Sequence, residues 1–492
     1  MIDSGTEEKM KRLDPCLLPL LLVTILSGVI AGCNTTGETR PGVAKTQKGL
    51  TDAEKIYGLS LLWMEATYNF AFFDQVPDLD WDATYRAFIP KVLDTRSTLE
   101  YYGVLERFYA LLQDGHTEVT PPESLLSRID SPGVVLGEFD QRIHVVRVLD
   151  SLVDRVPLGS EVIEVEGIPI RRHLEEKIFP YVASSTRNVL WKTGARLALS
   201  GERGTTIRIT LRLADGRERS VELRRDASSA SGRWVGPQSP RRELVEFRWL
   251  DEGIACLALG GFHDERVVTE FEKLLPELQR ARGLILDLRE NGGGSGSHAI
   301  AIVRHLTDRP FRGSATRMRY HVSTYASYGA FADRFPQFEK FREFHLRDAW
   351  ISNEAPTYDP GEGAKLKMPL VVLTGHRTAS AAEDMLLMLD SIGRGVRVGE
   401  PTRGSTGQPL LFDLPGGGRA RVCTKRDTYP DGRDFVGVGI LPHHPVSPTI
   451  EDVISGRDAV LEKGVEVLES LMSATPQRDA EAAVRRASHA IR

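Results

Sequence analysis

Cysteine is scarce in this chain: four cysteines occur among 492 residues, and they do not recur with histidine at the spacing of a metal site. Only Cys256 and Cys423 lie beyond the first 33 residues. Each sits within a strand-like apolar run, so we expect two buried thiols rather than a disulfide. Because this ligand pattern is missing, the sequence does not predict a metal site.

A surplus of positive charge is missing as well. The chain has 63 lysines and arginines against 68 aspartates and glutamates, a formal net charge of −5. No dense basic face interleaved with aromatic residues is visible, which argues against nucleic acid as a partner. Hydrophobic residues make up 41% of the chain and charged residues 27%, a balance typical of globular proteins, and the length predicts three or four structural units.

Long apolar runs are absent except for residues 16–30, which follow Lys11 and Arg12 and are too short to span a bilayer comfortably. This layout is typical of a signal peptide. The run ends at Ile30-Ala31-Gly32-Cys33, which resembles a bacterial lipobox. The resemblance implies a lipoprotein signal peptide over residues 1–33 and a membrane anchor of acyl chains on Cys33. It also implies a place in the bacterial cell envelope, facing the periplasm or the exterior; plain secretion is the alternative.

Three patterns follow the export signal. Residues 34–50 are polar and predict a flexible tether. Residues 51–120 carry bulky apolar side chains at helical spacing and predict a helical cap. Residues 131–226 alternate apolar with polar side chains and turn at Asp215-Gly216, which predicts a β domain containing a hairpin.

The second half of the chain has a different pattern. Residues 238–450 contain short buried strands followed by helices, which predicts an α/β core. Residues 311–367 interrupt this core, and their phenylalanines recur roughly at helical spacing, which suits either a packing helix or a lid over a site. Residues 451–475 predict a final amphipathic helix, and residues 476–492 a loose tail.

One strand-to-helix junction carries a candidate nucleophile. Ser380 falls where a buried strand gives way to a helix, and a helix start supplies unpaired N–H groups and positive potential. The N–H of Ala381 can face an oxyanion there, and a glycine turn earlier in the core can place the N–H of Gly292 or Gly293 opposite it. Taken alone, the serine also suits an N-cap and the glycines a plain turn.

Five short motifs occur in order around these residues. They are Asp287–Gly294, Thr378–Glu383, Gly399–Gly404, Tyr429–Gly432 and Gly437–Pro442. Together they resemble the tail-specific, or C-terminal-processing, serine protease family, which includes the tricorn core protease. An earlier stretch, Leu158–Gly167, is similar to a strand and turn of PDZ domains.

The resemblance implies a multidomain α/β fold. The expected order is the helical cap, a PDZ-like β domain and a crotonase-like ββα catalytic core. It also implies that Ser380 is the nucleophile, that Ala381 and Gly292 or Gly293 form the oxyanion hole, and that no cofactor is needed. The substrate would be a polypeptide that docks on the PDZ-like domain as an added strand.

The chain departs from the best-known members at the base. They use a Ser-Lys dyad, but the matching position here is Ser405, so Ser380 needs another proton acceptor. The branch resembling the tricorn core uses a histidine from just before the PDZ unit, where this chain has His116. An imidazole can accept a serine proton at neutral pH. His376 and His298 are the alternative bases.

The residue that orients the base is left open. Tricorn-like members place a glutamate where this chain has Val436. The candidates for an orienting or accessory role are Ser405, Asp434, Glu383, Asp114 and Glu400.

The sequence therefore predicts a serine peptidase that hydrolyses cell-envelope polypeptides through Ser380 and His116. The missing lysine and glutamate leave two alternatives, a non-catalytic peptide- or ligand-binding protein on the same fold and a serine esterase. Substrate preference and oligomeric state are not readable from the sequence.

Overall fold

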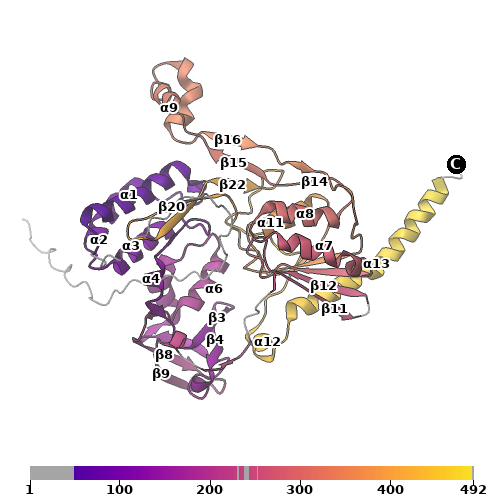
Figure 1. Cartoon of the computed structure of the whole chain (residues 1–492), viewed down its shortest axis with the longest axis horizontal. Helices are drawn as coiled ribbons and strands as arrows, with labels where there is room; N and C mark the ends of the chain where they lie inside the picture. The colour runs from indigo at the N-terminus through magenta and orange to yellow at the C-terminus, as the bar shows by residue number, and fades with distance from the viewer. Residues whose placement is uncertain (1–48, 230–231, 238–242, 252, 490–492) are drawn as a thin grey trace, which may run out of the picture.

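The computed structural model is described for residues 49–229, 232–237, 243–251 and 253–489. It has a mixed α/β fold in which a helical cap and a β domain lie beside an α/β core (Figure 1). The expected signal peptide, Cys33 and nearly all of the expected tether lie outside the described residues. None of the helices in the described part combines the length and the hydropathy needed to cross a bilayer.

The cap consists of three helices: α1 (Asp52–Asn69), α2 (Trp81–Leu93) and α3 (Thr98–Ala110). Their N-terminal N–H groups are capped by the side chains of Thr51, Asp80 and Ser97. Aromatic side chains fill the space between the helices, and the ring centroids of Trp81 and Phe108 stack 4.3 Å apart.

The cap is joined to the C-terminal part of the chain by a small sheet. Strand β1 (Glu118–Thr120) pairs with β21 (Arg419–Cys423), which pairs with β20 (Pro409–Asp413). The Tyr102 hydroxyl donates to the carbonyl of Pro415 at 2.8 Å and accepts from the N–H of Gly418 at 2.7 Å. The loop just before β1, which carries His116, is therefore held against the core.

The β domain is built on a sheet of seven strands, whose longer members are β3 (Val134–Phe139), β4 (Arg142–Leu149), β5 (Glu161–Val165), β8 (Thr206–Arg212) and β9 (Glu218–Arg224). The predicted hairpin is confirmed, since β8 and β9 pair antiparallel across a turn in which Gly216 has φ 82°. Among the strands of the described residues, β3 pairs only with β4, and helix α6 (Arg187–Leu197) packs beside it.

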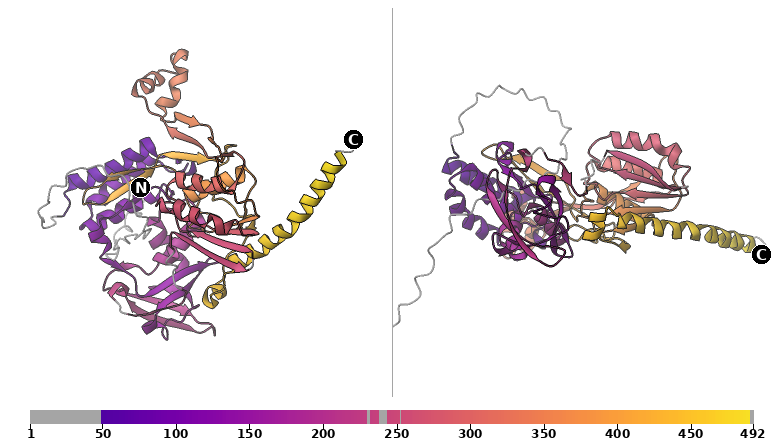
Figure 2. Two further views of the ribbon diagram at one scale, coloured as in Figure 1. Left: turned by 45° about the vertical axis from the view of Figure 1, so that its right-hand side comes forward. Right: turned by 90° about the horizontal axis from the view of Figure 1, so that it is seen from below.

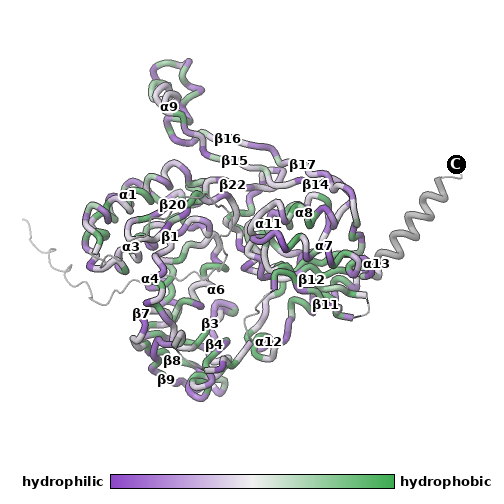
Figure 3. The backbone as a smooth tube through the Cα atoms, in the orientation of Figure 1, coloured by the Kyte–Doolittle hydropathy of each residue, from purple (hydrophilic) through white to green (hydrophobic). Residues whose placement is uncertain are grey.

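A sheet of six strands forms the α/β core. Its order is β11 (Val245–Asp251), β12 (Ile254–Leu259), β13 (Gly283–Asp287), β18 (Leu370–Thr374), β19 (Val396–Gly399) and β23 (His444–Pro445). All neighbours are parallel except β11 and β12. The central strands are buried on both faces, as expected for parallel strands, and appear as hydrophobic segments around β12 in Figure 3.

Helices cover both faces of this sheet. Helices α7 (Arg266–Leu278), α8 (Gly296–Leu306) and α11 (Ala381–Ser391) pack on one face, and α13 (Ala459–His489) packs on the other. Cys256 and Cys423 are buried free thiols, as predicted.

The predicted loose tail is wrong for most of its length. Helix α13 continues to His489 and extends away from the core (Figure 1). The segment after residue 475 is rich in alanine and arginine, which are strong helix formers.

The insertion at 311–367 forms a separate lobe rather than one packing helix. Strand β15 (Ala315–Arg319) pairs with β16 (Trp350–Asn353) and with β22 (Lys425–Thr428), and short helices join β15 to β16. The lobe projects from the molecule in Figure 1 and in the left view of Figure 2. Its aromatic rings pack largely on one another, and Phe331 remains 50% exposed.

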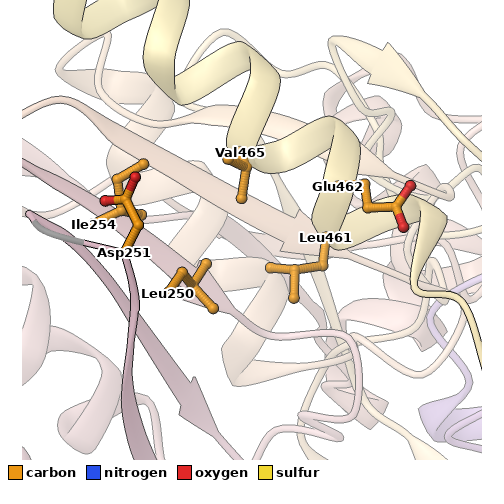
Figure 4. A pocket seen from close by; sticks show the side chains of 6 residues that line it. All are labelled: Leu250, Asp251, Ile254, Leu461, Glu462 and Val465. Atoms are coloured by element: carbon orange, nitrogen blue, oxygen red, sulfur yellow. The ribbon is translucent and has the colours of Figure 1, made fainter.

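A pocket of about 330 Å³ lies between β11, β12 and α13 (Figure 4). Four apolar side chains and the carboxylates of Asp251 and Glu462 line it. The predicted site residues are not among its lining residues, so this pocket is separate from the candidate active site.

Arg289 joins the sheet to α13. Its guanidinium bonds Asp287 at 2.8 Å and Asp458 at 2.7 Å, and Asp287 is buried. We expect Arg289→Ala to lower the free energy of unfolding by about 3–5 kcal/mol, because it removes the paired cation from a buried carboxylate. The exposed pair of Arg280 with Glu277 provides the control: Arg280→Ala should cost about 1 kcal/mol or less. Chemical denaturation measures both, and equal losses would contradict this role for Arg289.

Candidate active site

Ser380 lies at a strained turn between β18 and α11. Its backbone has φ 54° and ψ −125°, a conformation that side-chain-bearing residues rarely adopt. Its N–H lies 3.0 Å from Glu383 Oε2 and 3.1 Å from the carbonyl of Ser405. The side chain is half-buried, so the hydroxyl is not sealed in the interior. A serine on a sharp strand-to-helix turn is the arrangement that presents the nucleophile in α/β-hydrolases.

The glycine turn lies against this serine. A Cβ atom at Gly293, where φ is 94°, would lie 2.6 Å from Ser380 Cβ and 3.0 Å from the Ala381 nitrogen, so only glycine fits there. The N–H of Gly293, however, donates to Asn291 Oδ1 at 3.0 Å. The N–H groups of Gly292 and Ala381 have no partner among the described residues. Of the three predicted donors, two are therefore free and one is occupied.

Glu383 connects the parts of the site. Its side chain is fully buried, and Oε1 accepts from Thr402 Oγ1 at 2.5 Å and from the N–H of Gly404 at 2.7 Å. Oε2 accepts from the N–H groups of Ser380 at 3.0 Å and Ser405 at 3.1 Å. Burial raises the pKa of Glu383 to about 7, although these four hydrogen bonds oppose the shift.

His116 lies beside Ser405. The imidazole Nδ1 is 2.5 Å from Ser405 Oγ, and the backbone N–H of His116 donates to the buried Asp114 at 3.2 Å. Burial, together with the positive charges of Arg421, Arg403 and Lys425, holds the pKa of His116 well below its usual value. The lowered pKa keeps the ring neutral at neutral pH and makes it a weaker base than a free imidazole.

Ser405 is the link between the predicted base and the predicted nucleophile. Its side chain contacts His116, while its carbonyl accepts from the N–H of Ser380. No hydrogen bond joins His116 directly to Ser380 among the described residues. The structure thus brings the three residues into one site, with Ser405 contacting both of the others.

The other orienting candidates have different partners. Asp434 pairs with Arg426 at 2.6 Å, and Asp114 accepts from the side chains of Thr117 and Ser185. Among the described residues, no hydrogen bond joins either carboxylate to the His116 ring, although Asp114 accepts from the His116 backbone N–H.

The two alternative bases also have partners elsewhere. His376 Nδ1 lies 3.3 Å from Glu400, and His298 Nδ1 lies 2.9 Å from the carbonyl of Phe262. Burial opposes ionisation of Glu400, but His376 and Lys192, which lies 3.0 Å away, lower the pKa of Glu400 to about 2.

Sequence reasoning missed several neighbours of the site. Thr402 bridges Glu383 and the N–H of Ile440, and Lys425 pairs with the buried Asp427 at 2.9 Å. Thr402 lies within Gly399–Gly404, one of the five motifs, so the sequence does carry a signal for this residue. Lys425 lies in a short strand distant in sequence from Ser380, and no pattern marks it. Among the described residues, no group of three or more His, Cys, Asp and Glu side chains is placed to bind a metal.

Comparisons with known proteins show which proteins this chain is similar to. Residues 253–446 match the family model described as Peptidase family S41. The chain is 26% identical over 440 residues to the carboxyl-terminal-processing protease of Picosynechococcus sp., covering 89% of this chain and 90% of that protein. It is 30% identical over 224 residues to the tail-specific protease of Haemophilus influenzae, covering 42% of this chain and 30% of that protein. The solved structure of mature CPAF complexed with lactacystin has a similar fold, with a TM-score of 0.64 and 15% identity over 87% of this chain and 98% of that one.

The raised pKa of Glu383 predicts a pH-dependent stability. The folded chain holds the Glu383 proton more tightly than the unfolded chain does, so this contribution is complete below about pH 4.5 and is lost as the pH rises through about 7. Between pH 5 and pH 8 the free energy of unfolding of the wild type should fall by up to about 3 kcal/mol more than that of Glu383→Gln. Chemical denaturation at each pH measures both. Glu270→Gln, at an exposed pair, is the control and should follow the wild type. If the free energy of unfolding varied with pH in the same way for the wild type and Glu383→Gln, the raised pKa of Glu383 would be contradicted.

Proposed function

This chain carries a Peptidase family S41 domain and is a serine peptidase, and from that premise we propose that Ser380 is its nucleophile and His116 its base. The single observation that supports this assignment best is the position of Ser405. One residue contacts the His116 ring through its side chain and the Ser380 N–H through its carbonyl. A shared neighbour of this kind supports a geometry in which the imidazole from the loop after the cap serves the serine of the core.

The proposed reaction forms and breaks an acyl-enzyme. Ser380 Oγ attacks the peptide carbonyl carbon, and its proton passes to His116 Nε2 while the Nδ1–H donates to Ser405 Oγ. The C–N bond then breaks, and the departing amine takes the proton from His116. Water attacks the ester in the same way, with His116 again accepting the proton, and releases the acid and Ser380.

The oxyanion site would be formed by N–H groups around Ser380. The free N–H groups of Ala381 and Gly292 are available at once, and Gly293 joins them when the Asn291 side chain turns away. The Asn291 Nδ2 group is buried without a hydrogen-bond partner in the described part of the chain, so the present rotamer leaves one polar group of this side chain unsatisfied.

We infer that the β domain is PDZ-like and the core crotonase-like, and that the substrate docks on the β domain. Strand β3 has one unpaired edge beside α6, which suits a peptide added as a further strand. The domain also touches the site: Ser185 accepts from the N–H of Gly115 at 2.9 Å, and a Cβ at Gly404 would lie 2.8 Å from Thr186. A peptide leaving this edge would have a short path to Ser380.

We further propose that the chain is anchored in a bacterial cell envelope by acyl chains on Cys33. The support is the lipobox-like sequence after residues 16–30. Polypeptides of the envelope would then be the accessible substrates.

A non-catalytic binding role is the second candidate. Two observations favour it: His116 makes no direct bond to Ser380, and the N–H of Gly293 is occupied. Neither observation would hold in a complex in which ligand binding rotates the His116 ring and the Asn291 side chain.

Fluorophosphonate labelling separates the two candidates. The wild type should label, Ser380→Ala should not label at all, and His116→Ala should label at least about 100-fold more slowly because the serine lacks a base. His345→Ala, an exposed histidine of the projecting lobe, should label like the wild type. An unlabelled wild type would support the binding role, and normal labelling of His116→Ala would remove His116 as the base.

Ser405 offers a finer test of the His116 geometry. Ser405→Ala should lower kcat by about 10–100-fold with KM little changed, because the ring loses its orienting partner but no group that contacts substrate. Ser405→Thr should recover part of the loss, since it retains the hydroxyl. Steady-state kinetics on a quenched peptide measure both, and an unchanged kcat in Ser405→Ala would show that the ring is positioned without this residue.

A further inference from the structure

The six-stranded core sheet ends at a strand whose outer edge is unpaired. Strand β11 lies at one end of the sheet order and pairs, among the described residues, with β12 alone. The carbonyl of Leu244, just before β11, accepts from the N–H of Gly260 at 2.9 Å. Because backbone groups alternate along an antiparallel strand, Val245, Phe247 and Trp249 direct their N–H and C=O groups away from β12. These outward groups have no hydrogen bond in the described part of the chain.

One face of this edge carries apolar side chains. Val245 and Phe247 are half-buried against the core. Phe247 and Trp249 pack edge to face with their ring centroids 5.6 Å apart, and Trp249 remains 38% exposed. A seven-residue edge strand of this kind is a template for pairing with another chain unless something covers it.

The opposite face of β11 carries charges of both signs. Glu246 and Arg248 are exposed and flank Phe247 on either side. Glu246 accepts from the N–H of Glu243 at 3.3 Å, and Arg248 lies opposite Cys256 of β12 and hydrogen-bonds its thiol. Neither charged group has an ion-pair partner among the described residues. The strand therefore presents one unpaired negative and one unpaired positive side chain, arranged symmetrically about its middle.

We propose that β11 pairs antiparallel with β11 of a second copy of this chain, so that the two core sheets join into one across a twofold axis at Phe247. Such a contact is isologous: a residue before Phe247 lies opposite the residue equally far after Phe247 in the other copy. Glu246 of each copy then lies opposite Arg248 of the other copy, and Val245 lies opposite Trp249.

The charges select this register. Since Val245, Phe247 and Trp249 carry the outward backbone groups, Glu246 and Arg248 fall in non-hydrogen-bonded pairs, where opposite Cα atoms are about 4.5 Å apart and the side chains are closest. Opposite charges in such a pair are stabilising, and like charges are destabilising. Moving the axis by one residue would place Glu246 opposite Glu246, or Arg248 opposite Arg248. The axis at Phe247 gives two opposite-charge pairs and two pairs of tryptophan with valine.

The pocket at the end of β11 suits the same partner. Its apolar lining comes from β11, β12 and α13 and consists of Leu250, Ile254, Leu461 and Val465 (Figure 4). In the proposed register, Leu244 of the second copy lies opposite Leu250. An apolar side chain would therefore cover part of an apolar surface that otherwise faces water.

Another sheet edge of the molecule lacks these properties. Strand β9 ends the sheet of the β domain, but its exposed side chains are polar or charged. The carbonyl of Glu222 on this strand also accepts from Arg155 at 2.7 Å, so its edge is partly occupied. The candidate active site is compatible with pairing at β11, since Ser380 follows β18, three strands in from that edge.

Sedimentation velocity of the full chain tests the pairing. The wild type should sediment as a dimer at micromolar concentration and dissociate on dilution. Arg248→Glu and Glu246→Arg each place two like-charge pairs in the interface, so each should raise the dissociation constant at least about tenfold. Arg224→Glu, an exposed charge reversal on the edge strand β9, should dimerise like the wild type.

A mixture of the two variants separates loss of pairing from loss of folding. Glu246→Arg presents two positive charges and Arg248→Glu two negative ones, so an equimolar mixture should form a heterodimer at concentrations where each variant alone is monomeric. The double variant Glu246→Arg/Arg248→Glu should dimerise like the wild type, because its charge pairs are only exchanged. A monomeric wild type, or an Arg248→Glu variant that dimerises as tightly as the wild type, would overturn the proposal. A mixture that stays monomeric although both variants give the wild-type circular dichroism spectrum would also overturn it.

Disulfide trapping checks the register without changing a charge. Val245→Cys and Trp249→Cys chains, oxidised together, should form a linked dimer on a non-reducing gel, because hydrogen-bonded antiparallel pairs have Cα atoms about 5.5 Å apart, within reach of a disulfide. Each variant alone should show only the background of the wild type, whose Cys256 and Cys423 are buried. Efficient linkage of Trp249→Cys to itself, or no linkage in the mixture, would reject the axis at Phe247.

Discussion

The candidate site depends on one buried carboxylate. Glu383 lies one turn into α11 and accepts hydrogen bonds from the nucleophile position, from Thr402 and from two successive N–H groups of the following loop. Four donors around one charge are what allow a fully buried glutamate to remain in the fold. The same bonds hold Ser380 at its positive φ, because both the turn and the loop that flanks it are tied to the same two oxygen atoms.

The second constraint is the connection between distant parts of the chain. His116 and Ser405 are 289 residues apart, and the strand pairing of β1 with β21 brings them together. Ser405 occupies the position where the best-known members of the resembling family have lysine. In its place the chain has an imidazole bonded to a hydroxyl, and burial, together with the charges of Arg421, Arg403 and Lys425, holds the pKa of that imidazole well below its usual value.

Sequence reasoning predicted the elements that follow from simple patterns. Continuous apolar runs marked β13 and β18, alternation marked β8 and β9, and a strand followed by small residues marked Ser380. Ser405 and Glu383 were named as accessory residues, but their partners were not readable, because those partners are backbone N–H groups and a histidine far along the chain. The occupied N–H of Gly293 was equally hidden, since it depends on the rotamer of Asn291. The straight continuation of α13 was missed because polarity was taken for disorder, although helix propensity alone favours a helix there.

The long separation within the site has a consequence for synthesis. A nascent chain extended only through α11 contains His116 and Ser380, but it lacks Ser405 and the strand β21 that holds the His116 loop. Chain growth proceeds from the N-terminus, so these parts become available only after synthesis has passed residues 405 and 423. The proposed peptidase activity would therefore appear only late in synthesis. An incomplete chain released before then would not cleave the proteins around it.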